Sequence, residues 1–483
     1  MHIDISVVVP VYNPGTYLQP LLRSLEQQTM ASERFEVILV DDGSDDGTAE
    51  RLDAWAAEHS NTLVVHQPNH GWPGQPRNVG IDRAAGRYIY FVDQDDWLGD
   101  EALARVVAYG DENNSDVVIG KMKGIGRGVP RRLFAASVPK AVIGRTPLQD
   151  SLTPHKVFRT AFLERIGLRF PEGKRRLEDH LFVTTAFLRA DVVSVYADYD
   201  CYIHITRDDH GNAAGRLYEP ADYYRNLEEV LDVVDRYLPA GERKDRYLQR
   251  WIRTELVGRL KSRLLRNASR TRRDAFFTEI SRILRTRIPD SAFRILPFQL
   301  RLDAALARYG NAKQFFRLDH AVRGITLVAS PSADGVFTVR LLDGIHRISP
   351  TARVSDLLHA HGAANLVPGV VALVGGDPLI LPPTADVTRP DGAKARAQRV
   401  GESAQYALDP ITPGDTVTIA GPLGPRSGTV VDLRRRRVRR SVTIRQLTKA
   451  FRRSASHTAR QLLGPRRTAQ VRALMKRARR RAD

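Results

Sequence analysis

The N-terminal quarter of the chain alternates between short apolar runs and segments with helical spacing, and this alternation constrains the fold more than any other feature. Four runs rich in β-branched and aromatic residues have the length and composition of buried strands; they are residues 5–12, 35–40, 62–66 and 88–92. Between the first two runs, leucines recur at three- and four-residue spacing, as on one face of a helix. Repeated β-α units predict an α/β domain with a mainly parallel sheet and helices on both faces.

Polar residues follow three of these runs at the point where each strand is expected to end. Because parallel sheets bind ligands beyond the carboxyl ends of their strands, we expect the three clusters to converge on one crevice. This convergence is a stronger signal than any single cluster. In strand order the clusters are Asp41-Asp42, the loop from Asn69 to Arg77, and Asp93-Gln94-Asp95-Asp96.

The Asp-x-Asp arrangement in the last cluster favours a divalent cation. Mg²⁺ and Mn²⁺ prefer hard oxygen ligands, commonly one or two carboxylates together with substrate phosphates and water. One carboxylate can then reach a ribose hydroxyl while the next but one reaches the metal. A structural alternative is that Asp96 or Asp100 caps the helix expected from Glu101 onward. We expect Trp97 to pack in the core.

The other basic and acidic groups also have structural alternatives. Asp, Gly and Ser suit a turn and a helix N-terminus, so Asp41 and Asp42 need not bind a ligand. Arg77 lies near a predicted helix start and is placed to bind a diphosphate, or else is a surface arginine. Lys156 and Arg159 either approach a phosphate-bearing acceptor or form a solvated strand end.

Four motifs together resemble those of the family 2 glycosyltransferases of the GT-A fold, over residues 3–215. They are VPVYN at residues 9–13, VDDGSD at 40–45, RNVG at 77–80 and FVDQDDW at 91–97. The resemblance implies an inverting sugar transfer from a nucleotide sugar, usually a UDP-sugar, with a divalent cation, Mn²⁺ or Mg²⁺. Two features depart from the pattern. Pro76 stands where the family commonly has Ala, and two adjacent acids, Asp41 and Asp42, are both candidates to contact the nucleobase.

The resemblance also implies roles for individual residues. It assigns Asp42 to the uracil, Asp93 to the ribose and Asp95 to the metal. Inversion requires a general base that deprotonates the acceptor hydroxyl. Glu178-Asp179 matches the family's Glu-Asp helix start, so Asp179 is the expected base. Glu178 can stabilise the helix through its negative charge at the N-terminus. The other nucleotide-sugar contacts that it implies are Pro10, Tyr12, Asn69, Arg77, Gln94, Arg207 and His210.

The segment ITRDDHGN at residues 205–212 narrows the resemblance. A loop of this kind, followed by a helical linker and a β-sandwich, is similar to the bacterial wall teichoic acid glycosyltransferases that decorate poly(ribitol phosphate) with N-acetylglucosamine. Arg207 and His210 are then expected to close on the diphosphate or the metal. The alternative for His210 is a loop histidine without a role.

The composition and the spacing of apolar residues change along the chain, and these changes predict four regions. Residues 1–215 form the GT-A domain, and residues 216–318, with apolar side chains at helical spacing and many Arg/Glu pairs, form a helical linker. Short strands separated by Gly, Pro and Asp, among them residues 370–374, predict a β-sandwich over 319–433. This domain either forms a homo-oligomer or holds the polymer acceptor. Residues 434–483 form a polybasic tail.

The net charge of +19 is concentrated in that tail. It carries 19 Lys and Arg and one acid, whereas the preceding 433 residues carry 55 basic and 54 acidic residues. Polybasic segments bind polyanions, and helical spacing of Leu and Phe among the arginines fits a membrane-surface helix. We expect the tail to contact an anionic membrane or the anionic polymer; a solvated tail is the alternative. No zinc ligands or stacking motif indicate a specific nucleic-acid partner.

The remaining composition places limits on the cellular setting. The single cysteine, Cys201, excludes an intramolecular disulfide and suits a reducing compartment. The N-terminus lacks a leader pattern and no run has the length of a membrane span. These features predict a cytoplasmic protein, peripheral at the inner membrane face where the tail contacts it.

The sequence therefore predicts an enzyme that moves a sugar, in the first instance N-acetylglucosamine, from a UDP-sugar to a hydroxyl of a phosphate-rich cell-wall polymer such as poly(ribitol phosphate). Two alternatives stay open. One keeps the chemistry and changes the acceptor to a capsular or lipid-linked glycan. The other is a polyanion- or membrane-binding adaptor whose transferase domain is inactive.

Overall fold

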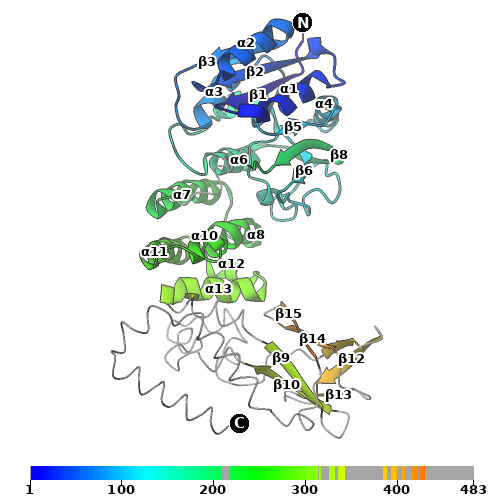
Figure 1. The fold of residues 1–483 in the computed structure, drawn as a ribbon, viewed down its shortest axis with the longest axis vertical. Helices are drawn as coiled ribbons and strands as arrows, with labels where there is room; N and C mark the ends of the chain where they lie inside the picture. Colours follow the sequence, from blue (N-terminus) through cyan, green and yellow to red (C-terminus); the bar gives the residue numbers. More distant parts are fainter. Residues whose placement is uncertain are drawn as a thin grey trace, which may run out of the picture. The chain divides into compact units, whose positions relative to one another are not determined.

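The structure of the chain is a computed structural model, shown in Figure 1. Residues 1–325 fall in one compact unit, and residues 326–342 and 381–421 belong to a second. The structure describes residues 2–208, 218–313, 315–316, 326–331, 336–342, 384–388, 393–399, 405–407, 416–421 and 424–429.

The first unit contains an eight-stranded sheet with the strand order β3-β2-β1-β4-β7-β6-β8-β5. The pairs β1–β2, β2–β3, β1–β4 and β6–β8 are parallel, whereas β7 and β5 run antiparallel to their neighbours. The predicted mainly parallel α/β sheet is confirmed. Its strands are β1 (Ile5–Val11), β2 (Phe35–Asp41), β3 (Thr62–His66), β4 (Tyr88–Phe91), β5 (Trp97–Leu98), β6 (Val117–Ile125), β7 (Val157–Arg159) and β8 (Val193–Ile205).

The strand order creates a switch point between β1 and β4. The chain runs outward from β1 through β2 to β3 and then returns to place β4 on the other side of β1. Connections that leave in opposite directions open a crevice at the carboxyl ends of these strands. β1 and β4 are buried along their whole length, as their continuous apolar sequences require at the centre of a sheet.

Helices cover this sheet. α3 packs on β1 and β2, α4 packs on β6 and β8, and α1 packs on β5. The apolar face of α1, with Leu18, Leu21, Leu22 and Leu25 buried, is the leucine spacing seen in the sequence. The helices of this part are α1 (Leu18–Glu26), α2 (Thr48–Glu58), α3 (Gly74–Arg83), α4 (Ala102–Glu112), α5 (Thr160–Ile166) and α6 (Glu178–Arg189).

The helical segment predicted after the sheet is present. α7 packs against α6 and α11, and α11 also packs against α13. A π-helical segment, Ile252–Leu256, directly continues α8. The α-helices of this segment are α7 (Pro220–Tyr237), α8 (Glu242–Trp251), α9 (Val257–Leu260), α10 (Arg263–Arg266), α11 (Arg270–Thr286), α12 (Asp290–Arg294) and α13 (Phe298–Tyr309).

The described strands of the second unit form one seven-stranded sheet in the order β15-β14-β11-β12-β13-β10-β9. The β-rich region is therefore confirmed, while the second layer of a sandwich stays a prediction. The expected strand at 370–374 and the tail at 434–483 lie outside the described residues. The strands are β9 (Thr326–Pro331), β10 (Val336–Leu342), β11 (Thr384–Thr388), β12 (Lys394–Arg399), β13 (Gln405–Ala407), β14 (Thr416–Gly421) and β15 (Gly424–Thr429).

Among the helices in the described ranges, none combines the length and the apolar composition that crossing a membrane requires.

Candidate active site

The carboxylate of Asp93, at the end of β4, is held by two nitrogen donors from distant parts of the chain. Arg77 Nη2 lies 2.8 Å from Asp93 Oδ1, and His155 Nε2 lies 2.8 Å from Asp93 Oδ2. Arg77 is only 4% exposed, so it is not the surface arginine of the sequence alternative, and His155 is only 2% exposed. Burial opposes ionisation of Asp93, but His155 and Arg77 hold the pKa of that carboxyl well below its usual range. Asp93 is therefore an anion whose charge the protein itself compensates.

Asp96 joins the turn after β4 to the end of β8. The hydroxyl of Tyr202 donates to Asp96 Oδ2 at 2.7 Å, and the backbone N–H of Ile205 donates to Oδ1 at 2.9 Å. Burial, and after it the charge of Asp93, raises the pKa of Asp96 to about 8. The alternative in which Asp96 caps the next helix is wrong, because α4 begins only at Ala102.

Asp95 completes a group of three carboxylates that fits a divalent cation. Oxygens of Asp93, Asp95 and Asp96 lie within 4.8 Å of one another. Burial, followed by the negative charge of Asp93, raises the pKa of Asp95 to about 6, so a positive ion at this position would favour its ionised form. Both oxygens of Asp93 and of Asp96 accept hydrogen bonds from the protein.

Two histidines behind this turn form a second possible donor group with Asp96. Ligand atoms of Asp96, His155 and His204 also lie within 4.8 Å of one another, and all three residues are buried. The His155 ring stacks on Tyr202 at 4.4 Å between centroids. Burial lowers the pKa of both His155 and His204. His204 contacts His155 and Tyr202 edge-on, so the two imidazoles support the turn, and their nitrogens are of the kind that binds a soft or borderline cation.

The end of β1 forms the neighbouring wall of the crevice. Gln94 bridges to it, because its Oε1 accepts from the Tyr12 N–H at 2.7 Å and its Nε2 donates to the Tyr12 carbonyl at 3.0 Å. The Tyr12 side chain is 45% exposed and offers an aromatic face on which a base can stack. The predicted contact of Gln94 with the nucleotide therefore competes with its use in positioning Tyr12.

Asp42 is buried at the end of β2 and already accepts hydrogen bonds from the protein. Gln67 Nε2 donates to Asp42 Oδ1 at 2.6 Å, and the His70 N–H lies 3.1 Å from both oxygens. Asp41 faces β3, where Oδ2 lies 3.0 Å from His66 Nδ1. Each acid thus has a structural partner, and a carboxylate with four lone-pair positions can accept further bonds.

The other predicted nucleotide contacts are spread around the same edge of the sheet. Pro10 is buried in β1 opposite Val40, and Asn69 is exposed in the loop after β3. The guanidinium of Arg207 lies over the ring of Tyr17, 4.4 Å from its centre. His210 lies outside the described residues.

Glu178 and Asp179 begin α6, and Arg77 connects them to the Asp93 turn. Arg77 Nη1 lies 3.8 Å from Glu178 Oε1, so one guanidinium serves acids on two different elements. Leu177, the residue before the helix, has a φ of 64°, a left-handed conformation that leucine rarely adopts and that is typical of functional sites. Burial raises the pKa of both acids, and the charge of Asp179 adds to the shift of Glu178.

Lys156 is fully buried beside Asp179. Its Nζ donates to Ser151 Oγ at 3.0 Å and to the Thr153 carbonyl at 2.5 Å. Burial lowers the pKa of Lys156 to about 7, and the negative charge of Asp179 works against this lowering. The prediction that Lys156 meets a phosphate-bearing acceptor is wrong because the side chain is inaccessible. Arg159 instead donates to the backbone carbonyl of Ser115, between α4 and β6.

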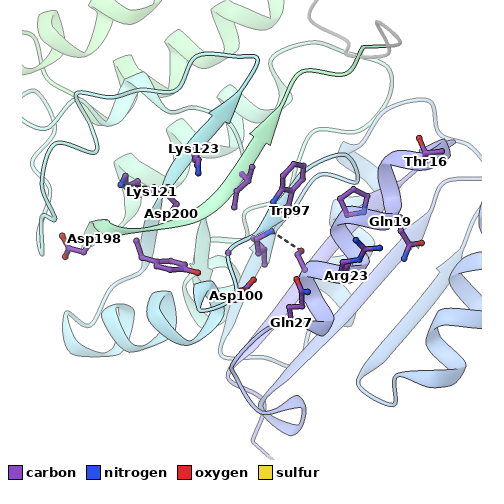
Figure 2. Close-up of a pocket in the computed structure, with 16 residues that line it drawn as sticks. Thr16, Gln19, Arg23, Gln27, Trp97, Asp100, Lys121, Lys123, Asp198 and Asp200 are labelled. Carbon is purple, nitrogen blue, oxygen red and sulfur yellow. Dashed lines mark hydrogen bonds and ion pairs between the residues drawn. The ribbon is translucent and has the colours of Figure 1, made fainter.

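A groove of about 790 Å³ lies next to this region, between α1 and the strands β6 and β8. Figure 2 shows Trp97 in the groove, with Arg23 of α1 on one side and Lys121 and Lys123 of β6 on the other. Trp97 is partly exposed there, so the expectation that it packs in the core is wrong. Of the described residues that line the groove, none is a carboxylate of the Asp93, Asp95 and Asp96 group.

The sequence did not indicate which side chains hydrogen-bond to the acids of the Asp93–Asp96 turn or pair with their charge. His155, Tyr202 and His204 belong to segments more than 50 residues from the turn that they contact. No local pattern marks them, since each is an ordinary residue of a strand or a strand start. Only the antiparallel placement of β7 next to β4 brings His155 to Asp93.

Two family models match the chain. Residues 6–165 match glycosyl transferase family 2, and residues 220–319 match the glycosyl transferase TarS linker domain. The poly(ribitol-phosphate) beta-glucosyltransferase of Bacillus spizizenii is 38% identical over 233 residues, which are 48% of this chain and 36% of that protein. The poly(ribitol-phosphate) beta-N-acetylglucosaminyltransferase TarS of Staphylococcus aureus is 36% identical over 226 residues, 47% of this chain and 39% of that protein. The chain thus spans less than two fifths of these relatives.

Solved structures agree with the sequence matches. A crystal structure of Staphylococcus aureus TarS 1–349 in complex with UDP-GlcNAc superposes with a TM-score of 0.60 at 27% identity, covering 71% of this chain and 98% of that one. The match covers both the sheet domain and the helical segment that follows it. The strand-end motifs, the switch-point crevice and these likenesses agree: the chain contains a glycosyl transferase family 2 domain of the GT-A type, matched at residues 6–165, and a linker of the TarS type, matched at residues 220–319.

Proposed function

We propose that this protein transfers a sugar from a UDP-sugar, with inversion, to a hydroxyl of a phosphate-rich cell-wall polymer such as poly(ribitol phosphate). The observation that carries the proposal is the meeting of two acidic groups at one crevice. Asp93, Asp95 and Asp96 fit a divalent cation, and Asp179 at the start of α6 has a raised pKa. A cation site for a diphosphate beside a candidate base is what a nucleotide-sugar transfer needs.

On the donor side, three residues contact the nucleotide and a fourth holds the metal. Tyr12 stacks on the uracil, Asp42 accepts a hydrogen bond from it, and Asp93 accepts one from the ribose. Asp95 holds Mn²⁺ or Mg²⁺, which when bound neutralises charge on the leaving diphosphate. Gln94 keeps Tyr12 in place through its backbone, and Arg77 keeps Asp93 ionised. Asn69, Pro10, Arg207 and His210 complete the proposed set of contacts.

On the acceptor side, Asp179 takes the proton from the attacking hydroxyl. Inversion requires that this base lie on the face of the sugar away from the leaving group. A carboxylate with a raised pKa is a stronger base than an ordinary aspartate, because burial makes its ionised form less stable. The pKa of Lys156, buried nearby, is lowered to about 7, and where Lys156 is protonated its charge favours the ionised form of Asp179.

The choice of sugar and acceptor rests on the relatives. The Bacillus spizizenii protein is named as a glucosyltransferase and the Staphylococcus aureus protein as an N-acetylglucosaminyltransferase, and both names specify poly(ribitol phosphate). We propose N-acetylglucosamine, the sugar of the UDP-GlcNAc in the TarS crystal structure. Glucose is the alternative that the experiment must distinguish.

A panel of nucleotide sugars tests this proposal. The full chain is incubated with each donor and with Mn²⁺ or Mg²⁺, and released UDP is measured with and without poly(ribitol phosphate). We expect UDP-GlcNAc and a metal ion to be required, and the polymer to accelerate UDP release. Equal release with and without the polymer for every donor would contradict the proposed acceptor.

We also propose a role for the basic tail and for the β-rich domain. The 19 basic residues after Leu433 would tether the enzyme to an anionic membrane or to its polymer, and the β-rich domain would support a homo-oligomer. Truncation after Leu433 should weaken binding to anionic liposomes or polymer while UDP-sugar hydrolysis is preserved. Unchanged binding after truncation would rule out the tethering role.

A further inference from the structure

A second cavity, of about 280 Å³, lies between the loop that precedes β7 and helix α8 of the linker. Its charged lining consists of four arginines and one acid, and we refer to it as the arginine cavity. The charged residues are Arg132, Arg145, Arg246, Arg253 and Asp150. The larger groove of Figure 2 differs, because its three cationic side chains face three aspartates.

The positive charge of the arginine cavity is only partly compensated. Arg253 Nη2 lies 2.5 Å from Asp150 Oδ1, and Arg246 Nε donates to Glu242 at 2.9 Å. Within the part of the chain that the structure describes, Arg132 and Arg145 take part in no ion pair and no side-chain hydrogen bond. Guanidinium groups that line one cavity repel each other, and an anion such as a phosphate, whose oxygens accept from several N–H donors, relieves that repulsion.

Gln149, which also lines the cavity, has a side chain that a bare anion would not satisfy. The side-chain oxygen of Gln149 is buried and has no hydrogen-bond partner among the described residues. A buried acceptor without a donor is costly. A ligand that carries a hydroxyl next to a phosphate would satisfy Gln149 and the arginines at once. A polyol phosphodiester has this combination of groups.

Two elements connect the arginine cavity to the proposed base. The segment that begins at Asp150 continues to Lys156, and Ser151 Oγ accepts a hydrogen bond from Lys156 Nζ at 3.0 Å. On the other side, Trp251 at the end of α8 contacts His180, the neighbour of Asp179, through a 3.4 Å hydrogen bond from Nε1 to Nδ1. A polymer bound in the cavity is therefore held by the same elements that support Asp179.

We propose that the arginine cavity binds a phosphodiester of the polyol-phosphate acceptor, at a repeat unit other than the one that reacts. This inference rests on the proposed function, because it assumes an anionic polymer as acceptor. A chain with a phosphate in every repeat can be held at one unit while another presents its hydroxyl. Arg132 and Arg145 contact the phosphate, and Gln149 accepts from an adjacent hydroxyl.

The test compares two double variants of the full chain. Arg132→Gln with Arg145→Gln removes the two uncompensated charges. The matched control, Arg263→Gln with Arg285→Gln, makes the same charge change at exposed arginines of α10 and α11 outside the cavity. Transfer kinetics are measured at varied poly(ribitol phosphate) and at varied UDP-sugar. Binding of poly(ribitol phosphate) and of inorganic phosphate is measured directly, without donor.

The cavity variant should have a KM for polymer about tenfold or more above that of the control, because charge-assisted hydrogen bonds to the polymer are lost. Its KM for UDP-sugar and its kcat should stay close to those of the control. Polymer binding should weaken in parallel and depend less on salt. An equal effect in both variants, or wild-type binding of inorganic phosphate as tight as that of the polymer, would overturn the inference. Polymer binding that depends on Arg132 and Arg145 without any sugar transfer would support the cavity and contradict the proposed function.

Discussion

The two sides of the crevice are built in different ways. On the donor side, Asp42, Asp93 and Asp95 follow strands directly, so a short motif and a parallel sheet suffice to bring them together. On the base side, Lys156 and Asp179 belong to separate segments and meet only through packing. Arg77 contacts acids on both sides. The comparison teaches that, apart from Arg77, the proposed metal site and the proposed base rest on different contacts, which substitutions should be able to separate.

The largest expected effect comes from Asp179→Asn. The amide cannot take the proton of the acceptor, so transfer should fall by about 10²- to 10⁴-fold, the usual contribution of a general base. UDP-sugar binding should change little, because the donor side is intact. Steady-state transfer and direct binding titrations measure the two effects.

A suitable control for that substitution is Asp222→Asn on α7, where an exposed aspartate pairs with Arg225 at 3.2 Å. It should transfer sugar at the wild-type rate. Transfer by Asp179→Asn at a rate similar to that of the control would exclude Asp179 as the base.

Asp95→Ala should have the next largest effect. Loss of the principal ligand removes the charge stabilisation that a bound cation supplies, so we expect transfer to fall by about 10²-fold and its response to added Mn²⁺ to disappear. The measurement is transfer rate against metal concentration. A variant that keeps the wild-type metal response would show that another carboxylate is the principal ligand.

Lys156→Met should have a smaller effect than Asp95→Ala, and it should appear in the pH dependence of sugar transfer. The raised pKa of Asp179 means that the ionised base is lost as the pH falls, at a higher pH than for an ordinary aspartate. The positive charge of Lys156 opposes this protonation, so its removal should move the acid limb of the rate profile to still higher pH.

The profile is measured from pH 5 to pH 8, with thermal unfolding to check that the variant is folded, since Ser151 and Thr153 lose a donor. If the acid limb of the rate profile of a folded variant lies at the same pH as in the wild type, Lys156 does not affect the pKa of Asp179. Restoration of the limb by Lys156→Arg would support an effect of charge.

The smallest effect is expected for Trp251→Phe. The substitution keeps an aromatic ring but removes the donor to His180 Nδ1, next to Asp179. A neutral hydrogen bond of this kind contributes about 1 kcal/mol, so kcat should fall by no more than about fivefold. The KM for UDP-sugar should not change, because the described hydrogen-bond partners of Asp42 and Asp93 belong to other elements than α8. A change in that KM would break the proposed separation of the two sides.

The sequence is informative about the donor side for a physical reason. Turn residues, strand composition and acidic clusters at strand ends are local, so the parallel sheet and the carboxylates at 93–96 could be predicted. The contacts of His155, Tyr202 and Lys156 could not, because they depend on β7 and β8 joining the sheet between or beside other strands. The burial of Arg77 and the exposure of Trp97 were missed for the same reason.

The most direct test of this account is one titration: the affinity for UDP-GlcNAc against Mn²⁺ concentration, in the wild type, Asp95→Ala and Asp179→Asn. We predict that Mn²⁺ strengthens binding equally in the wild type and in Asp179→Asn, and that Asp95→Ala shows no such gain. If Asp179→Asn also loses the gain, or Asp95→Ala retains it, the crevice is not divided into a metal-binding donor side and a separate base.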